Sequence, residues 1–222
     1  MHIFDIIGPI MIGPSSSHTA GAVRLGRVAN KVLEGAEPAE VTVELSGSFA
    51  KTYKGHGTDR ALLAGIMGYH SYSEEIRYIF KLADAKNIKY KFIPTTIPNS
   101  HPNTARIHVV AKNGETCTVE GASIGGGNIK VDWINGLKVN FTGECNTIMI
   151  LHKDRPGAIA DVTSLMREKY SNVNIGSFRL DRTVKGGQAL MTIEIDGMPP
   201  KGMIEDMRKI SQVDNVMLVR SI

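Results

Sequence analysis

Apolar positions in the first part of the chain recur with a helical period in some segments and with a strand period in another. Residues 15–34 begin with hydroxyl side chains suited to helix capping and continue with apolar residues at helical spacing. Residues 58–68 and 73–85 show a similar helical pattern, whereas residues 40–49 alternate apolar and polar side chains. These segments predict three helices and one half-buried strand.

Short strand-like runs fill the rest of this region. They cover residues 89–93, 104–112, 116–124, 129–134 and 137–141. Asn113-Gly114 and Asn135-Gly136 separate neighbouring runs, and an Asn-Gly pair is a strong hairpin signal. The mixture of helices and strands predicts an α/β domain over residues 1–143.

The pattern changes after a short polar link at residues 143–146. The expected order is then strand, helix, strand, strand, helix, strand, over residues 147–151, 157–169, 173–181, 188–196, 201–210 and 213–220. A βαββαβ order is typical of the ferredoxin-like fold, a four-stranded antiparallel sheet with two helices on one face. The sequence therefore predicts a second, α+β domain over residues 147–222.

Composition is that of an ordinary folded protein and excludes several classes of function. The 222 residues are 42% hydrophobic and 22% charged, enough for two modest domains. The 26 basic residues are scattered and aromatic residues make up only 6%, so no nucleic-acid surface is expected. The chain starts without the basic segment of a signal peptide, and no apolar stretch approaches the ~20 residues of a membrane span. We expect a cytoplasmic protein that does not bind membranes.

Cysteine usage argues against a metal cluster held by this chain. Its two cysteines, Cys117 and Cys145, are too few for a disulfide framework and lack the spacing of zinc or iron-sulfur ligands. If the protein works with a metal cluster, another chain must hold it.

The most concentrated polar segment is Gly13-Pro14-Ser15-Ser16-Ser17-His18-Thr19-Ala20-Gly21. It stands at the expected start of a helix, where free backbone N–H groups and the helix dipole favour an anion such as a carboxylate. The hydroxyls of Ser15, Ser16, Ser17 and Thr19 are therefore candidate carboxylate ligands. An elaborate helix cap is the alternative interpretation.

Two further polar loops contain a histidine. One is Gly55-His56-Gly57-Thr58-Asp59 and the other is Asn99-Ser100-His101-Pro102-Asn103. Because α/β folds gather their binding loops at one edge of the sheet, we expect these loops and residues 13–21 to meet at one cleft. The run Gly125-Gly126-Gly127 is either a tight bend or a backbone nest for an anion, and the sequence favours neither.

Together these motifs closely resemble the β chain of bacterial iron-sulfur-dependent L-serine dehydratase (L-serine ammonia-lyase), over the whole chain. The motifs that carry the resemblance are Phe4-Asp5-Ile6-Ile7-Gly8-Pro9 and residues 12–21, 55–59, 100–103 and 123–127. The resemblance implies an N-terminal domain similar to the allosteric substrate-binding domain of some phosphoglycerate dehydrogenases. The segment 147–222 resembles an ACT domain, a small-molecule regulatory module of amino-acid enzymes.

The resemblance also implies the reaction and its cofactor. L-Serine loses water to give aminoacrylate, which becomes pyruvate and ammonia. A partner α chain holds a [4Fe-4S] cluster through its own cysteines, and no pyridoxal phosphate (PLP) is used. This chain would be the β subunit, contributing to catalysis together with the α chain.

Dehydration needs a base for the α-proton, and imidazoles titrate near neutral pH. His18 and His56 are therefore candidates for base and acid, and the sequence does not decide which is the base. The hydroxyls of residues 15–19 and Asp59 would bind the substrate. The remaining candidates, which would orient the substrate or close over it, are Asn99, Ser100, His101 and Asn103.

In serine-sensing ACT domains similar to residues 147–222, a histidine in the first turn and an asparagine at the second strand touch the ligand. The corresponding candidates are His152, Asp154 and Gly157 in the turn and Asn174 at the strand. Asp154 stands where some members carry asparagine. We expect L-serine to bind between two self-associated copies, and the alternative is a dimerisation module with an empty cleft.

A different class of function is a non-catalytic regulatory subunit that binds an amino acid. The three histidine loops favour the enzyme, because a pure sensor has little use for several titratable groups in one cleft. Binding of a phosphate ester is disfavoured, because no Walker-type lysine accompanies the serine- and glycine-rich loops.

Overall fold

The computed structural model describes residues 9–182 and 184–221. The chain divides into two compact units, Met1–Gly136 and Leu137–Ile222. The strand that follows this division, β6 (Leu137–Phe141), is still the last strand in the order of the first sheet. The domain limits expected at residues 143 and 147 therefore stay a prediction. The motif at residues 4–9 lies outside the described residues except for Pro9.

The first unit contributes five strands to a six-stranded mixed sheet with the order β2-β1-β3-β4-β5-β6. These five strands are β1 (Pro38–Leu45), β2 (Lys89–Pro94), β3 (Thr104–Ala111), β4 (Thr116–Gly125) and β5 (Asn128–Ile134). β1 runs parallel to β2, and β3, β4 and β5 continue antiparallel from β1. A parallel pair requires a crossover connection, and the helices between β1 and β2 supply it.

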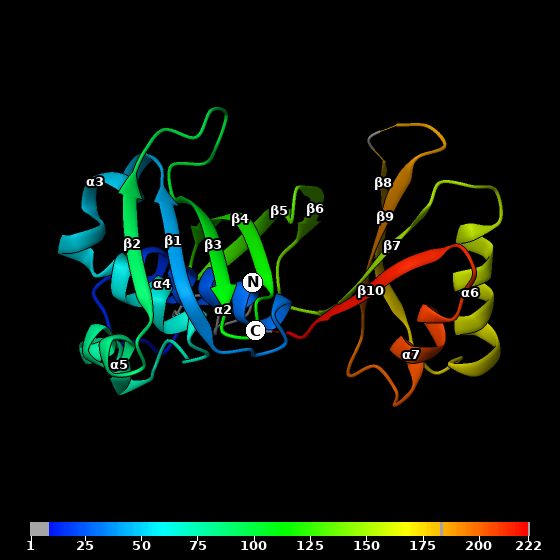
Figure 1. Cartoon of the computed structure of the whole chain (residues 1–222), viewed down its shortest axis with the longest axis horizontal. Helices are drawn as coiled ribbons and strands as arrows, with labels where there is room; N and C mark the ends of the chain where they lie inside the picture. Colours follow the sequence, from blue (N-terminus) through cyan, green and yellow to red (C-terminus); the bar gives the residue numbers. More distant parts are fainter. Residues whose placement is uncertain (1–8, 183, 222) are drawn as a thin grey trace. The chain divides into compact units, whose positions relative to one another are not determined.

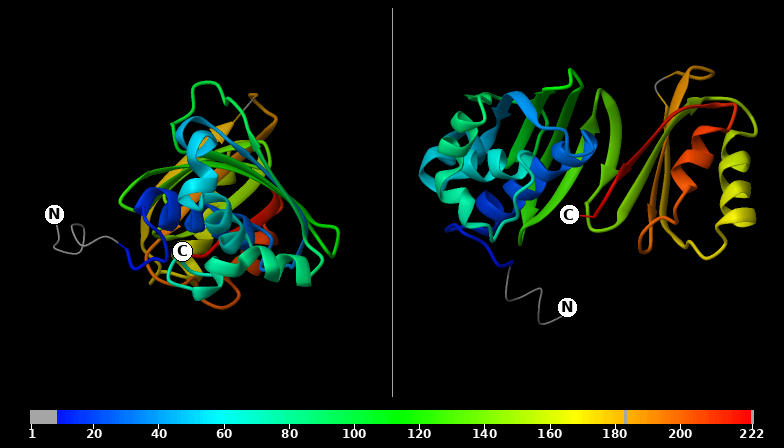
Figure 2. Two further views of the ribbon diagram at one scale, coloured as in Figure 1. Left: turned by 90° about the vertical axis from the view of Figure 1, so that its left-hand side faces the viewer. Right: turned by 60° about the horizontal axis from the view of Figure 1, so that its bottom comes forward.

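The helices of this unit lie on one side of its sheet (Figures 1 and 2). They are a π-helical turn η1 (Ser16–Gly21), α2 (Ala22–Val32), α3 (Gly47–His56), α4 (Thr58–Ile66), a 3₁₀ turn η2 (Glu74–Tyr78) and α5 (Ile79–Ala85). Val41, Val43 and Leu45 of β1 are buried, whereas the residues between them are only half-buried. This alternation is that of a sheet covered on one face.

Helices α2 and α4 pack closely because each presents a glycine to the other. A Cβ atom on Gly26 would overlap the carbonyl oxygen of Leu62, and one on Gly65 would overlap that of Val23. η1 leads into α2, and the His56-Gly57 turn leads into α4. The crossing therefore holds together the helices that follow the two histidine motifs.

Helix α3 corrects one expectation. The strand predicted over residues 40–49 ends at Leu45, and the chain turns through Gly47 (φ 59°) into a helix. Phe49 is the only buried residue of this helix, so no apolar period announces it. The helix predicted over residues 15–34 is present, but its first turn is π-helical.

The second unit confirms the predicted βαββαβ order. Its elements are β7 (Asn146–Lys153), α6 (Ala158–Lys169), β8 (Ile175–Arg182), β9 (Gln188–Ile195), α7 (Met203–Arg208) and β10 (Val213–Val219). The strand order β10-β7-β9-β8, with every pairing antiparallel, is that of the ferredoxin-like fold. Both helices lie on one face of this sheet (Figures 1 and 2).

Side chains from the sheet and from both helices form the core of the second unit. Ile150, Val162, Met191 and Met207 are among its fully buried members. Within residues 9–182 and 184–221, no helix combines the length and the apolar character needed to cross a membrane.

Candidate functional site

The structure brings two of the three motif histidines into direct contact. The rings of His18 and His56 meet edge to face, with centroids 4.7 Å apart and planes at 88°. His18 lies in η1 and is 8% exposed, whereas His56 ends α3 and is exposed. The predicted convergence of these two motifs is present in the structure.

Hydroxyl groups surround the imidazole of His18. Its Nδ1 lies 3.3 Å from Oγ of Ser15, and its Nε2 lies 3.1 Å from Oγ1 of Thr52 and 3.4 Å from Oγ of Ser48. Phe49 packs against the ring at a centroid distance of 5.2 Å. Hydroxyl groups therefore contact both ring nitrogens of His18, and the aromatic ring of Phe49 packs against the imidazole.

Burial lowers the pKa of His18 below 6.5, and the positive charge of protonated His56 lowers it further. The neutral form of His18 therefore dominates at neutral pH. A neutral imidazole has a free lone pair on one nitrogen, which is what a general base requires.

A cavity of about 380 Å³ opens beside His56. Its wall consists of Ile12, Gly13, Pro14, Thr19, Lys54, Gly55, His56, Gly57, Arg60, Ile76 and Arg77. Residues of both histidine motifs therefore line one cavity. A volume of this size is within the usual range for small-molecule sites.

Three cationic side chains of this wall, Lys54, Arg60 and Arg77, were not among the residues predicted from the sequence. Arg60 also lies 5.9 Å from the ring centroid of Phe80, in cation–π geometry. Cations at a cavity wall favour an anionic ligand such as a carboxylate. The sequence contains one indication of two of these cations, namely that they flank a histidine motif. Lys54 directly precedes Gly55, and Arg60 directly follows Asp59.

The predicted hydroxyl ligands have different roles in the structure. Ser15 caps η1, and its Oγ accepts the backbone N–H of His18 at 3.3 Å. Thr19 is buried and lines the cavity, and Ser16 and Ser17 are half-buried on the same turn. The cap interpretation and the site interpretation of this segment are therefore compatible.

Asp59 lies in the first turn of α4 and is 8% exposed. Its carboxylate accepts the backbone N–H of Arg60 at 2.8 Å, and burial raises its pKa above the ordinary value. It is not part of the cavity wall described above.

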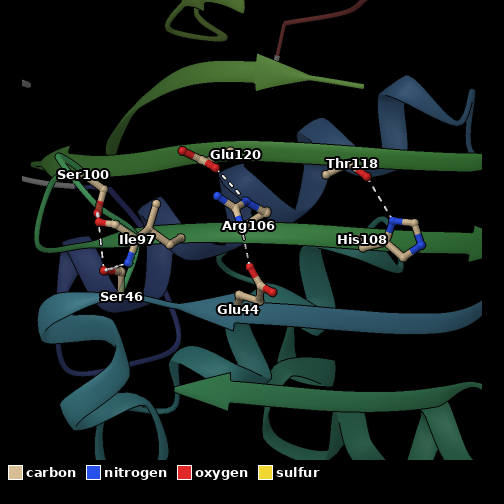
Figure 3. Close-up of polar contacts among 8 residues, drawn as sticks. All are labelled: Glu44, Ser46, Ile97, Ser100, Arg106, His108, Thr118 and Glu120. Carbon is tan, nitrogen blue, oxygen red and sulfur yellow. Dashed lines mark hydrogen bonds and ion pairs between the residues drawn. The ribbon is translucent and has the colours of Figure 1, made fainter. Parts of the chain in front are cut away.

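The third histidine loop is held mainly by its own contacts. His101 is exposed, and its Nδ1 accepts the backbone N–H of Asn103 at 3.1 Å. Ser100 donates to the carbonyl of Ile97 at 2.7 Å and lies 3.3 Å from Oγ of Ser46 (Figure 3). Asn99 is exposed with φ 56°. Among the described residues, no hydrogen bond or ring contact joins this loop to the His18–His56 pair.

The loop nevertheless touches the helix that carries His56. The carbonyl of Pro102 accepts the backbone N–H of Ser48 at 2.6 Å, at the start of α3. Gly47 permits this approach, because a Cβ atom there would lie 2.5 Å from the Pro102 oxygen. The loop therefore supports the first turn of α3, from which Ser48 contacts His18.

Arg106 lies on the sheet face opposite the helices, between two carboxylates. It forms ion pairs of 2.8 Å with Glu44 on β1 and with Glu120 on β4 (Figure 3). Two acidic partners more than neutralise its charge, so this residue is not a free anion-binding group.

The triple-glycine segment is a hairpin turn between β4 and β5. Gly125, Gly126 and Gly127 all have positive φ, and the carbonyl of Gly127 accepts from the Arg24 guanidinium at 3.0 Å. A tight bend that only glycine forms without strain explains the run.

In the second unit, the predicted effector residues are hydrogen-bonded to their neighbours. Asn174 donates to Asp196 at 2.7 Å, and Gly157 has φ 94° before α6. His152 is 2% exposed and donates from Nδ1 to the carbonyl of Lys153 at 2.8 Å. Its Nε2 is buried without a hydrogen-bond partner among the described residues.

Asp154 joins the first turn of this unit to the loop between β8 and β9. It accepts from Arg182 at 2.8 Å and from the backbone N–H of Gly186 at 2.9 Å. The hydrogen bond from Gly186, followed by that from Arg182, lowers the pKa of Asp154. These contacts stabilise its charged form.

The donor set of this chain does not fit an iron-sulfur cluster. Cys117 is buried, and burial raises the pKa of its thiol to about 12, whereas cluster ligands are thiolates. Cys145 lies in the other unit. Over residues 9–182 and 184–221, no three His, Cys, Asp or Glu side chains are grouped as metal ligands.

Comparison with known proteins relates these features to a family. Residues 2–132 match the family model described as "Serine dehydratase beta chain". The chain is 41% identical to "Probable L-serine dehydratase, beta chain" of Bacillus subtilis over 96% of each chain. It is also 41% identical to "L-serine dehydratase, beta chain" of Peptoniphilus asaccharolyticus, over 87% of this chain and 86% of the relative.

Among solved structures, the ACT domain of the GTP pyrophosphokinase of Chlorobium tepidum is similar to part of this chain. The match covers 33% of this chain and 94% of the ACT domain, with 20% sequence identity and a TM-score of 0.28. The ferredoxin-like assignment stands on the strand order of the second unit. The matched residues 2–132 include the histidine pair and the whole cavity wall. On this match and the two nearly full-length relatives, the chain belongs to the family of serine dehydratase β chains.

Proposed function

We propose that this chain is the β subunit of a two-chain L-serine dehydratase and supplies the substrate-carboxylate site and the proton-transfer pair. The observation that carries the proposal is the contact between His18 and His56 beside a cavity with three cationic side chains. The names of the two β-chain relatives support L-serine as the substrate and an α chain as the partner.

Carboxylate binding would use the positive wall of the cavity. Lys54 and Arg60 stand on either side of the His56-Gly57 turn, and Arg77, which also pairs with Glu74 at 3.4 Å, joins them from η2. Thr19 adds a hydroxyl from η1. Charge-assisted hydrogen bonds from such groups are roughly twice as strong as neutral ones and would fix the orientation of the amino acid.

Proton transfer would use the two imidazoles in different roles. Burial keeps His18 neutral, so it accepts the proton from Cα of L-serine. The electron pair of the Cα–H bond forms the Cα–Cβ double bond as the Cβ–O bond breaks. His56, exposed at the cavity wall, gives a proton to the departing oxygen, so that water leaves.

The thiols of this chain are unsuited to a cluster, so a [4Fe-4S] cluster would belong to the α chain. Bound there, it would supply a Lewis acid. No PLP is required by the proposal. The groups that this chain contributes, the two imidazoles and the cationic wall, do not depend on how the partner binds its cofactor.

The test is anaerobic reconstitution from separately purified chains. We expect this chain alone and the α chain alone to give no pyruvate from L-serine, and the mixture to give pyruvate and ammonia. Full activity of the α chain alone would contradict the proposal and would indicate a regulatory subunit. The nearly full-length match to serine dehydratase β chains does not favour that alternative.

A further inference from the structure

The hydrogen bonds around His18 define which ring nitrogen carries its proton. Nε2 faces Thr52 and Ser48 of α3, at 3.1 and 3.4 Å, and Nδ1 faces Ser15 at 3.3 Å. Each of these neighbours is a hydroxyl, which has one hydrogen to donate and two lone pairs that accept. The direction of each bond therefore depends on where each hydroxyl hydrogen already points.

Thr52 is able only to accept from His18. Its hydroxyl donates to the carbonyl oxygen of Ser48, one helical turn earlier, at 2.8 Å. Since the single hydroxyl hydrogen is used there, the contact of 3.1 Å with Nε2 is a hydrogen bond only if Nε2 is the donor. The shorter of the two hydroxyl contacts of Nε2 therefore requires that this nitrogen carries the hydrogen, and Ser48 at 3.4 Å is able to accept from it as well.

Ser15 is compatible with this assignment at the opposite edge of the ring. Its Oγ accepts the backbone N–H of His18 at 3.3 Å, which leaves its own hydrogen available for Nδ1. In the neutral ring with Nε2 protonated, Nδ1 has the lone pair that accepts this hydrogen. Both edges of the ring are then satisfied by one tautomer.

We propose that Thr52 is a positioning residue, which holds neutral His18 in the Nε2–H tautomer and leaves Nδ1, beside Ser15, as its only proton-accepting atom. Ser15 directly follows Gly13 and Pro14, which line the cavity, whereas Nε2 faces α3. When Nδ1 takes up a proton, the Ser15 hydroxyl turns its hydrogen away and accepts from Nδ1, and the imidazolium keeps its Nε2–H bond to Thr52. The tautomer rests on geometry alone, and its consequence for turnover rests on the function proposed above.

Nitrogen NMR of the full chain with nitrogen-15-labelled histidine tests the tautomer, because a protonated and a bare ring nitrogen differ in chemical shift. Loss of signals in His18→Gln assigns the ring. We expect the wild-type ring to be protonated at Nε2 and bare at Nδ1. Thr52→Val, which removes the acceptor with little change of shape, should shift population to the Nδ1–H form, and Thr52→Ser should restore the wild-type spectrum.

Thr163→Val is the matched control. Thr163 lies on α6 and makes the same bond to a carbonyl one turn earlier, that of Ile159 at 2.9 Å, so its loss should leave the His18 spectrum unchanged. A wild-type ring protonated at Nδ1 would overturn the inference, and this measurement needs no variant of Thr52. A His18 spectrum that is unchanged in folded Thr52→Val would overturn it as well.

Kinetics with the α chain test the consequence for turnover. We expect Thr52→Val to lower kcat by about tenfold or more, because a misplaced proton on a catalytic imidazole removes general-base catalysis, while KM changes by less than about twofold. Thr52→Ser should retain most of kcat. A changed tautomer with unchanged kcat would overturn the role of His18 as base, whereas an unchanged tautomer overturns the positioning role of Thr52.

Discussion

The ring of His56, at the end of α3, meets the ring of His18 edge to face at a centroid distance of 4.7 Å. This contact joins the buried imidazole of His18 to the exposed imidazole of His56, which lines the cavity. In the reconstituted enzyme, His18→Gln and His56→Gln should each lower kcat by about 10² to 10⁴-fold, the usual contribution of a positioned acid or base. Pyruvate formation measures this, with circular dichroism to verify folding. Losses below about threefold for both would show that the pair is structural.

Removing a positive charge from the cavity wall should weaken substrate binding. Lys54→Met keeps the length of the side chain and should raise KM for L-serine by about tenfold, with a smaller effect on kcat, since a hydrogen bond to a charged group contributes about 1.5–3 kcal/mol. Lys51→Met, on the same helix but outside the cavity wall, is the control and should leave KM unchanged. Equal KM values for the two variants would exclude Lys54 from the substrate site.

Burial of His18 predicts a dependence of stability on pH. Its pKa is lowered in the folded state, so below pH 6.5 the unfolded chain binds more protons and the free energy of unfolding falls as the pH falls. His70, whose pKa is also lowered by burial, adds to this trend. Thermal unfolding between pH 7.5 and about 5.5 should show a steeper loss of stability in wild type than in His18→Gln. Parallel curves would contradict the burial of a neutral imidazole.

The crossing of α2 and α4 should tolerate no side chain at its glycines. Gly65→Ala places a methyl group against the carbonyl of Val23 and should destabilise the protein by about 1–3 kcal/mol, the usual cost of overpacking. Gly55→Ala, in α3 with open space around its Cβ position, should be neutral or stabilising. Denaturant unfolding compares the two variants. Similar stability would mean that the helices separate at little cost.

The second unit should bind L-serine near its first turn, where buried Nε2 of His152 lacks a partner among the described residues. Calorimetric titration of the full chain with L-serine should give heat from the second unit that is reduced in Asn174→Ala and persists in Lys54→Met, which weakens binding only in the cavity of the first unit. No heat at millimolar L-serine would leave only the dimerisation role. Loss of the heat in Lys54→Met alone would place the binding in the first unit.

Much of the fold follows from local pattern. The alternation in β1 is visible in the sequence because this strand has one buried face, and the βαββαβ order of residues 147–222 is visible as a succession of apolar runs. The same holds for α2, whose apolar stripe includes Leu25 and Val28. Helix α3 was missed because Phe49 alone is buried, so its position depends on Gly47 and Pro102 rather than on an apolar period.

The residues of the candidate site also fall into those that the sequence indicates and those that it does not. Residue types and motif spacing were enough to select His18, His56 and the hydroxyl run, and to relate the chain to serine dehydratase β chains, a relation that the comparisons confirm. A histidine within a polar motif is a candidate because few side chains titrate near neutral pH, although His101 shows that such a candidate need not join the site. A lysine or an arginine is not, since most are solvated surface residues, and Lys54 and Arg60 were therefore overlooked.

Only the tertiary structure decided which groups meet. It placed Thr52 of α3 on Nε2 of His18, brought three cations to one cavity wall, and joined the loop of His101 to the start of α3 rather than to the histidine pair. The reason is physical. Local sequence determines the period and the ends of each element, but distances between side chains of different elements depend on how closely the helices pack, here on the absence of a Cβ atom at Gly26 and Gly65.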